Sequence, residues 1–371
     1  MIIDISDSNF KRIFKDEDFY LPIRWTGNNF VEYLDRLLNK YRTKIEKETV
    51  HFASDYKEIK ELELISRICN LLLKSIDNYL SGFPSKAYET FSDLMHYLME
   101  QPLRTYYKST HGSLVGYTDK LNLFRASCVK NNIRYDRKRL FHTPYNLRSK
   151  VATCRYSIAG FPSLYLGTNL ELCCEEIKYN PHSEFGIASR FQIERNILYN
   201  DTEIKVIELA VKPQDFLPQE NRSNERIGRK FDELDLNSKE IKSAYLLWYP
   251  VIAACSFIRI NKQDPFAVEY IVPQLLMQWV REEMEDIQEE AYDQLIGVRY
   301  FSCASERASD LGFNYVFPAS GKQHSEQFPF CPILMGAFRM TKPYFINEFE
   351  YINTCEFLMI KDNDLKHIND D

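Results

Sequence analysis

The sequence predicts an α+β fold in which an all-α segment precedes a segment of mixed strands and helices. In residues 1–110 the apolar residues recur at three- and four-residue steps, which is the pattern of amphipathic helices. From about Leu121 the pattern changes to alternating runs rich in Phe, Tyr, Val and Ile, with Gly and Pro between them, as in strands. Strands and helices do not alternate regularly there, so a parallel βαβ sheet is not predicted.

Three helices are predicted in the first segment. The first begins near Asn28, the second has an apolar stripe over residues 62–80 and ends at Gly82, and the third begins after Ser85. The stripe is wide enough for the core of a helical bundle. We therefore predict a helical N-terminal domain at residues 1–115, with a regulatory or targeting role, and a second domain at residues 116–371.

In the second segment, short apolar runs predict strands, among them CRYSIAG, SLYLG, FGIASRFQI, VIELAV, GVRYFS and NYVFP. Helices are predicted for LELCCEEIKYN, capped by Thr168 or Asn169, and for PQLLMQWVREEMED, which starts at Pro273. The longest apolar run, residues 246–258, predicts a buried element that Pro250 breaks.

Composition excludes several classes of protein. The net charge of −6 argues against a general nucleic-acid binder, and the basic stretch RYDRKR is too short to change this. Neither G-x-G-x-x-G nor a P-loop occurs. The nine cysteines lack paired C-x-x-C spacing, which favours reduced thiols over a metal site or disulfides. No apolar stretch approaches ~18 residues and the N-terminus does not resemble a signal peptide, so we expect a cytoplasmic protein without membrane contact.

Polar side chains are concentrated in residues 141–180, FHTPYNLRSKVATCRYSIAGFPSLYLGTNLELCCEEIKYN. Charged side chains are seldom buried unless they are paired, so this stretch is either a hydrated surface or a site. Tyr165 lies in the strand run SLYLG, which Gly167 closes, and Glu176 follows on the next helix beside Glu175. Arg125 in LFRAS and Ser302 in RYFSCAS also lie at the ends of apolar runs. Each residue alone is compatible with an ordinary structural role.

Together these motifs resemble the RES-domain family, which is named for an Arg, a Glu and a Ser. The resemblance covers about Leu121 to Pro318. Its most specific part is FH-x-P, then R-Y-S-x-x-G-x-P-x-L-Y-L-G, then a Tyr-to-Glu interval of the family's length, followed later by VPQLLMQWVRE and GVRYFS. By that interval Glu176 is preferred over Glu175. The two lie about 100° apart on a helix, so only one is expected to face a site.

The resemblance implies a fold like that of the ADP-ribosyltransferases, with a split, mostly antiparallel sheet flanked by helices. It also implies that NAD⁺ is a substrate rather than a bound cofactor, that no metal takes part, and that the protein is a toxin or defence effector. An antitoxin or other inhibitory partner is then expected to restrain it, unless the helical domain does so. The helical domain could equally form a homo-oligomer.

The residue types suit cleavage of the nicotinamide–ribose bond. The departing nicotinamide is a cation in NAD⁺, and positive charge grows on the ribose, which the Glu176 carboxylate can stabilise. Arg125, with Arg155 as a second candidate, offers a forked donor to the pyrophosphate. Tyr165 can stack on the nicotinamide or its ribose, and Ser302 can bond the ribose or hold Glu176. His142 is interpreted as structural.

The residues leave three alternatives open. A mono-ADP-ribosyltransferase would use the same site with a macromolecular acceptor in place of water or phosphate. A metal-independent ribonuclease would use Arg104 and His111, whose spacing is at the edge of the Arg-x(4–6)-His pattern of some helical ribonuclease domains. A binding protein with a decayed site would retain the residues without the activity.

Overall fold

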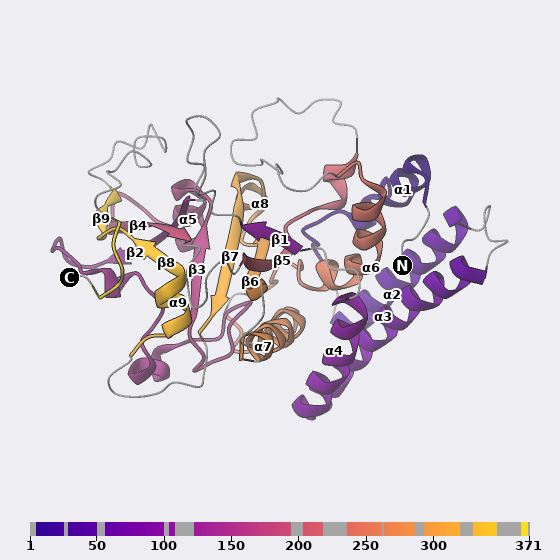
Figure 1. Ribbon diagram of the computed structural model, residues 1–371, viewed down its shortest axis with the longest axis horizontal. Coiled ribbons are helices and arrows are strands. Elements are labelled where there is room, and N and C mark those ends of the chain that lie inside the picture. The colour runs from indigo at the N-terminus through magenta and orange to yellow at the C-terminus, as the bar shows by residue number, and fades with distance from the viewer. Residues whose placement is uncertain are drawn as a thin grey trace. The chain divides into compact units, whose positions relative to one another are not determined.

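The computed structural model has the predicted α+β fold, with helices flanking a mostly antiparallel sheet (Figure 1). It describes residues 5–25, 29–49, 56–99, 104–107, 122–193, 203–217, 236–261, 263–285, 293–319, 329–346 and 365–369. The order of strands is β1-β5-β6-β7-β3-β2-β4-β8, and β9 also pairs with β4. Contacts within the chain divide it into two compact units, and each unit contains segments that are distant in the sequence.

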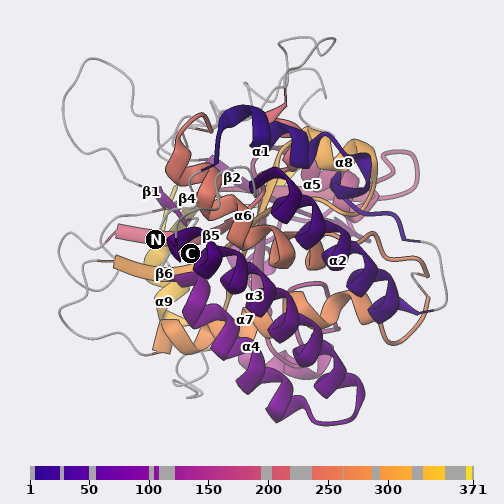
Figure 2. The ribbon, with the colours of Figure 1, turned by 90° about the vertical axis from the view of Figure 1, so that its right-hand side faces the viewer.

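The first unit is mainly helical and comprises residues 1–105, 207–225 and 230–279. In Figure 2 its three long helices α2, α3 and α4 run beside one another. Its helices are α1 (Asp7–Phe14), α2 (Phe30–Thr49), α3 (Tyr56–Leu80), α4 (Pro84–Met99), α6 (Lys239–Ala254) and most of α7 (Ile271–Glu285).

The three helices predicted from periodicity correspond to α2, α3 and α4. The predicted end of the second helix is also confirmed. Gly82 has a φ of +86°, and Phe83 donates its backbone N–H to the Asn78 carbonyl at 2.9 Å. This backbone conformation favours glycine, which has no Cβ to clash in the left-handed region.

The predicted boundary near residue 115 lies outside the described residues, so the division there stays a prediction. The helical unit nevertheless includes α6, which comes from much later in the chain and packs against α3. Every residue of α6 from Lys242 to Ala254 is buried. Removing the first ~110 residues would therefore expose the apolar surface of α6 to water.

The core of this unit contains a cluster of aromatic side chains from α1, α2, α6 and the short 3-10 helix Glu17–Phe19. The rings of Tyr41 and Tyr249 lie 4.5 Å apart, and Phe14 lies 5.2 Å from Tyr249. Phe19 and Tyr245 complete the cluster with edge-to-face contacts. All five are fully buried, and rings at such separations add stabilisation beyond their burial.

The prediction that Pro250 breaks its element is wrong, because α6 continues through Pro250 to Ala254. Proline has no N–H, so the Leu246 carbonyl, four residues earlier, loses its helical donor. The Tyr41 hydroxyl of α2 donates to this carbonyl at 2.8 Å instead. A partner from another helix thus satisfies the group that proline would leave without a hydrogen bond in a buried position.

The second unit contains most of the sheet. Every strand pair whose register is described is antiparallel. The strands of the sheet are β1 (Arg104–Tyr107), β2 (Asn122–Val129), β3 (Ser163–Gly167), β4 (Phe185–Ile193), β5 (Glu203–Leu209), β6 (Asp293–Phe301), β7 (Phe313–Pro318), β8 (Phe338–Met340) and β9 (Tyr344–Phe345). The helices of this second unit are α5 (Leu170–Ile177), α8 (Glu306–Leu311) and α9 (Pro332–Ala337).

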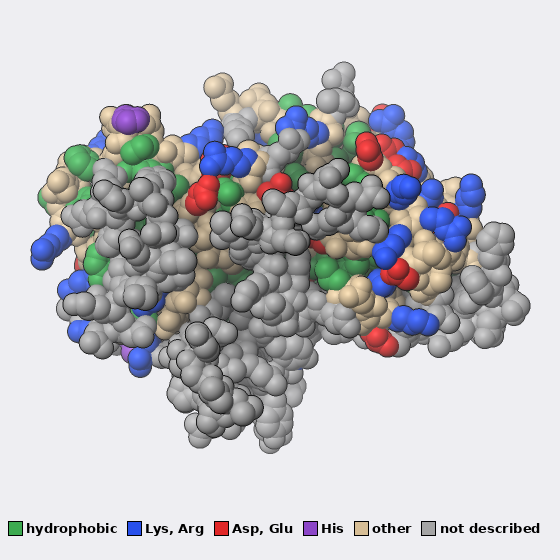
Figure 3. Space-filling view, turned by 90° about the horizontal axis from the view of Figure 1, so that it is seen from above, with side chains coloured by type: hydrophobic (Ala, Val, Ile, Leu, Met, Phe, Trp, Pro, Cys, Tyr) green, Lys and Arg blue, Asp and Glu red, His purple; other side chains and the backbone are tan. Residues whose placement is uncertain are grey.

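The surface carries charges of both signs. On the face drawn in Figure 3, Lys and Arg side chains are interspersed with Asp and Glu, so no single-sign field covers it. No helix in the described part of the chain is long and apolar enough to cross a membrane.

The Tyr41–Leu246 hydrogen bond gives a testable prediction. Tyr41→Phe leaves a buried carbonyl without a donor and should cost about 1–3 kcal/mol of unfolding free energy, measured with urea. In a Pro250→Ala background the restored N–H can bond Leu246, so the same substitution should cost less. Equal costs in the two backgrounds would contradict this explanation of how α6 tolerates proline.

Candidate functional site

The sheet is nearly divided in two between β2 and β3. Among the described residues of these strands, Phe124 and Gly167 are the one register pair that joins them. By contrast, β2 pairs with β4 from Asn122 to Val129, and β3 pairs with β7 along its whole length. The two strands therefore separate beyond this pair, and the candidate residues lie on both sides of the separation.

The Phe124–Gly167 pair forms the junction between β2 and β3. Helix α5 packs over this junction because Gly167 has no side chain. A Cβ on Gly167 would lie 2.8 Å from the Cys173 sulfur, closer than real contacts allow. The Cys173 thiol in turn donates to the Phe124 carbonyl at 3.2 Å. Helix and junction are thus held together at the point where the halves of the sheet meet.

The two adjacent glutamates of α5 have different partners, as their angular separation on a helix requires. Glu176 Oε1 accepts from Asn314 Nδ2 at 2.6 Å, and Asn314 pairs with Gly167 across β7 and β3. Glu175 Oε1 accepts from the Ser305 hydroxyl at 3.2 Å. Glu176 is therefore the carboxylate that lies over the strands beside the junction.

Tyr300 lies beside Glu176, and the sequence analysis did not select it. Burial raises the pKa of Tyr300 well above its usual value, and the nearby Glu176 and Tyr165 raise it further, while Arg155 opposes them. Tyr300 pairs with Asn314 in the sheet, and its ring packs 4.5 Å from that of Tyr156. Glu176, Tyr165 and Arg155 thus share one neighbourhood around a protonated phenol.

Arg125 lies on the face of β2 that is opposite to α5. Phe124 and Ala126 pack in the cluster under α5, so the alternation of a strand turns Arg125 to the opposite face. Its Nη1 donates to the Phe141 carbonyl at 3.1 Å. Burial, and then the charge of Arg139, lower the pKa of the Arg125 guanidinium to about 10.

Tyr165 is near both Arg125 and the group formed by Tyr300 and Glu176. It is among the groups that act electrostatically on Arg125 and on Tyr300. Its hydroxyl lies 2.6 Å from the Ser157 Oγ, which holds the ring between β3 and the preceding loop. The predicted residues therefore form two groups, one around Glu176 and one around Arg125, that meet at Tyr165.

Ser302 joins neither group through a described hydrogen bond. It is fully buried just after β6, two residues beyond Tyr300, and its Oγ accepts from the backbone N–H of Ala304 at 3.1 Å. The sequence reasoning missed Asn314 and Tyr300, although both lie in strand runs that it identified. Their polar side chains at alternating strand positions were the available signal.

His142 is structural, as the sequence analysis interpreted it. The Cys331 backbone N–H donates to Nε2 at 2.9 Å, so that nitrogen carries no proton. Nδ1 then carries the proton and donates to the Thr143 carbonyl at 2.9 Å. Burial of the ring is the main cause that lowers the pKa of His142 from 6.5 to about 4. Both nitrogens are satisfied only in the neutral ring.

The ribonuclease alternative lies outside what the structure describes. The Arg104 side chain and all of His111 are outside the described residues, and the Arg104 backbone begins β1 rather than ending a helix. No group of three His, Cys, Asp or Glu side chains in the described segments could hold a metal ion.

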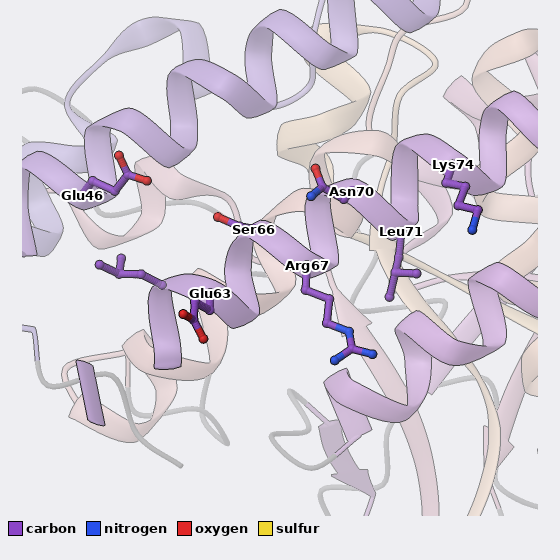
Figure 4. A pocket seen from close by; sticks show the side chains of 8 residues that line it. Glu46, Glu63, Ser66, Arg67, Asn70, Leu71 and Lys74 are labelled. Carbon is purple, nitrogen blue, oxygen red and sulfur yellow. The ribbon is translucent and has the colours of Figure 1, made fainter. Parts of the chain in front are cut away.

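A separate groove of about 490 Å³ lies on the helical unit, along α2 and α3 (Figure 4). It is lined by Glu46, Leu62, Glu63, Ser66, Arg67, Asn70, Leu71 and Lys74. Two acidic and two basic side chains face it, so its charge favours no single class of ligand. Arg67 also packs 4.3 Å from the Tyr97 ring of α4, a contact that accounts for it structurally.

The chain is similar to a protein of Bacillus subtilis (strain 168) that bears the name "Putative toxin YopC". The two are 26% identical over 333 residues, which span 87% of this chain and 67% of the Bacillus protein. No protein-family model matches the chain, and no solved structure matches it either. Membership of the RES-domain family therefore stays a prediction.

The arrangement of His142 predicts how stability depends on pH. The folded state holds the ring neutral, so the unfolded chain binds the extra proton between pH 6.5 and about 4. The stabilising contribution is present above pH 6.5 and is lost as the pH falls through this window, by ~3 kcal/mol at most.

The test compares wild type with His142→Gln, whose side chain does not titrate, by urea unfolding at pH 7.5 and at pH 4.5. The wild type should lose more stability on acidification than the variant does. Parallel losses in both proteins would show that His142 does not cause the acid sensitivity.

Proposed function

We propose that this protein cleaves the nicotinamide–ribose bond of NAD⁺ and acts as a toxin. The observation that carries the proposal is that Asn314, which pairs with Gly167 and Tyr300 in the sheet, holds the Glu176 carboxylate beside the junction of β2 and β3, the strands that carry Arg125 and Tyr165. The name of the Bacillus relative supports the toxin-like role, and the motifs shared with RES-domain proteins support the chemistry.

In this proposal Glu176 stabilises the charge that grows on the ribose as the nicotinamide leaves. A carboxylate does this best when it is held in one orientation before the reaction, because no reorganisation is then needed. The Asn314 amide holds Glu176 Oε1 by a hydrogen bond of 2.6 Å. The Tyr300 hydroxyl is protonated near neutral pH, as tyrosine ordinarily is, so it adds a neutral group beside the carboxylate rather than a second negative charge.

NAD⁺ is an extended molecule whose phosphates lie away from its reacting bond, and the two groups of residues suit its two parts. The nicotinamide riboside would lie against Glu176 and Tyr165, and the pyrophosphate would bind the guanidinium of Arg125. Arg155, whose charge acts on Tyr300, is the second candidate to bind the pyrophosphate. Ser302 Oγ accepts from the Ala304 N–H, so its own O–H would donate to the ribose.

The nucleophile that ends the reaction is water, phosphate or a macromolecule, because one oxocarbenium-like state accepts all three. We propose water or phosphate, which depletes NAD⁺ and accounts for toxicity without a further target. Mass spectrometry of the products formed in buffer, with phosphate and with cell lysate separates these acceptors. Label found only on a lysate macromolecule would favour mono-ADP-ribosyl transfer instead.

Substitution of the neighbouring glutamates tests the assignment. Glu176→Gln keeps the size and the hydrogen bonding of the side chain but removes its charge, and should lower kcat for NAD⁺ cleavage by about 100-fold or more. Glu175→Gln is the matched control, because its carboxylate bonds Ser305 rather than lying beside Tyr300. It should retain most of the activity.

Both proteins are assayed for nicotinamide release, after circular dichroism has shown that each is folded. Wild-type turnover by Glu176→Gln would show that this carboxylate is not the stabilising group. If the wild type leaves NAD⁺ intact, the proposed function itself is wrong.

A further inference from the structure

A buried hydroxyl without a partner lies beside Arg125. Ser189 of β4 is fully buried, and its Oγ has no hydrogen-bond partner among the described residues. A buried polar group without a partner is unfavourable relative to a satisfied one, and native structures contain few of them. An unmet donor in an otherwise well-packed strand is therefore a sign that something else bonds to it.

The register of the sheet brings Ser189 and Arg125 together. They are direct partners across β4 and β2, so their side chains extend from the same face with Cβ atoms roughly 5 Å apart. This is the face opposite to α5, because Ala188 and Ala126 pack in the cluster beneath that helix. The hydroxyl of Ser189 thus lies next to the base of the Arg125 side chain.

A second guanidinium reaches the same face. Arg139 Nη2 donates to the Ser127 Oγ at 3.4 Å, and Ser127 follows Arg125 by two positions on β2, so it shares the face of Arg125. The charge of Arg139 is the second cause, after burial, that lowers the pKa of Arg125. Two cations held this close repel each other, and an anion between them would remove that repulsion.

We propose that Arg125, Arg139 and Ser189 together form a binding site for a phosphate group. Two guanidinium groups supply forked N–H donors to its oxygens, and the Ser189 hydroxyl donates to a further oxygen. A phosphate group suits this set because it carries several negatively charged oxygens in a compact tetrahedron, whereas a carboxylate offers two in a plane.

The inference rests on the proposed function for the source of the phosphate, and it adds Arg139 and Ser189 to the residues that serve it. The phosphate group belongs either to the pyrophosphate of the dinucleotide or to free phosphate that serves as the acceptor. The chemistry of recognition is the same for both, so separate ligands are needed to distinguish them.

The test measures binding of ADP-ribose and of inorganic phosphate to the full-length protein by isothermal titration calorimetry at constant ionic strength. Ser189→Ala and Arg139→Gln should each weaken binding of at least one of these ligands by roughly tenfold, which is the loss of one hydrogen bond to a charged group. Ser189→Ala removes a hydroxyl that has no partner, so it should fold at least as well as the wild type.

Two control variants match these changes. Arg134→Gln removes one positive charge from an exposed position of the same basic stretch, and should leave binding unchanged. Ser75→Ala removes a buried hydroxyl that already donates to the Leu72 carbonyl in the helical unit, and should lower stability without altering binding.

Weaker binding of ADP-ribose alone would support the site and assign it to the pyrophosphate, and weaker binding of phosphate alone would assign it to the free ion. Weaker binding of both ligands would support a site that accepts a phosphate group from either source. Unchanged binding of both ligands by Ser189→Ala and Arg139→Gln would overturn the inference, as would a wild type that binds neither ligand. Because binding is measured without turnover, these results do not depend on NAD⁺ cleavage. An active enzyme with unaltered ligand binding in both variants would refute the phosphate site and leave the proposed function intact.

Discussion

The close approach of α5 to the sheet at Gly167 is the constraint on which the candidate site depends. The Cys173 sulfur occupies the space that a side chain on Gly167 would need, and its thiol bonds the Phe124 carbonyl on the neighbouring strand. This contact lies where β2 and β3 are joined, so it sets the distance of the helix from both halves of the sheet. Glu176, one turn further along α5, then meets Asn314 of β7.

The charges around the junction are arranged on two faces. Glu176 lies on the side covered by α5, with Tyr300 and Arg155 near it, whereas Arg125 and Arg139 lie on the other side of β2. Such a separation keeps the carboxylate from neutralising the guanidinium groups of Arg125 and Arg139, as a direct ion pair would. Both faces meet at Tyr165, where β2 and β3 have separated. A substrate with a cationic end and an anionic middle would find complementary groups on the two sides.

The helical unit illustrates how a local rule can be overridden by packing. Pro250 lies in the longest apolar run of the chain, and by propensity alone it should end a helix. Helix α6 continues because the Tyr41 hydroxyl bonds the carbonyl that proline leaves without a donor. The donor comes from α2, about 200 residues earlier, so no window of sequence around the proline could reveal it. The same long-range packing joins α6 to a unit that begins at the N-terminus.

The sequence by itself determined the fold class, the three long helices and the end of the second of them at Gly82, because periodicity and turn chemistry act over a few neighbouring residues. It also singled out Arg125, Tyr165 and Glu176, and a helix allows only one of two adjacent glutamates to face a given neighbour. Only the tertiary structure decided which neighbour each glutamate meets and that Tyr300 and Asn314 lie beside Glu176. It also decided that Ser189 lies opposite Arg125. These relations depend on strand register and on helix packing between residues far apart in the chain, and local sequence encodes neither.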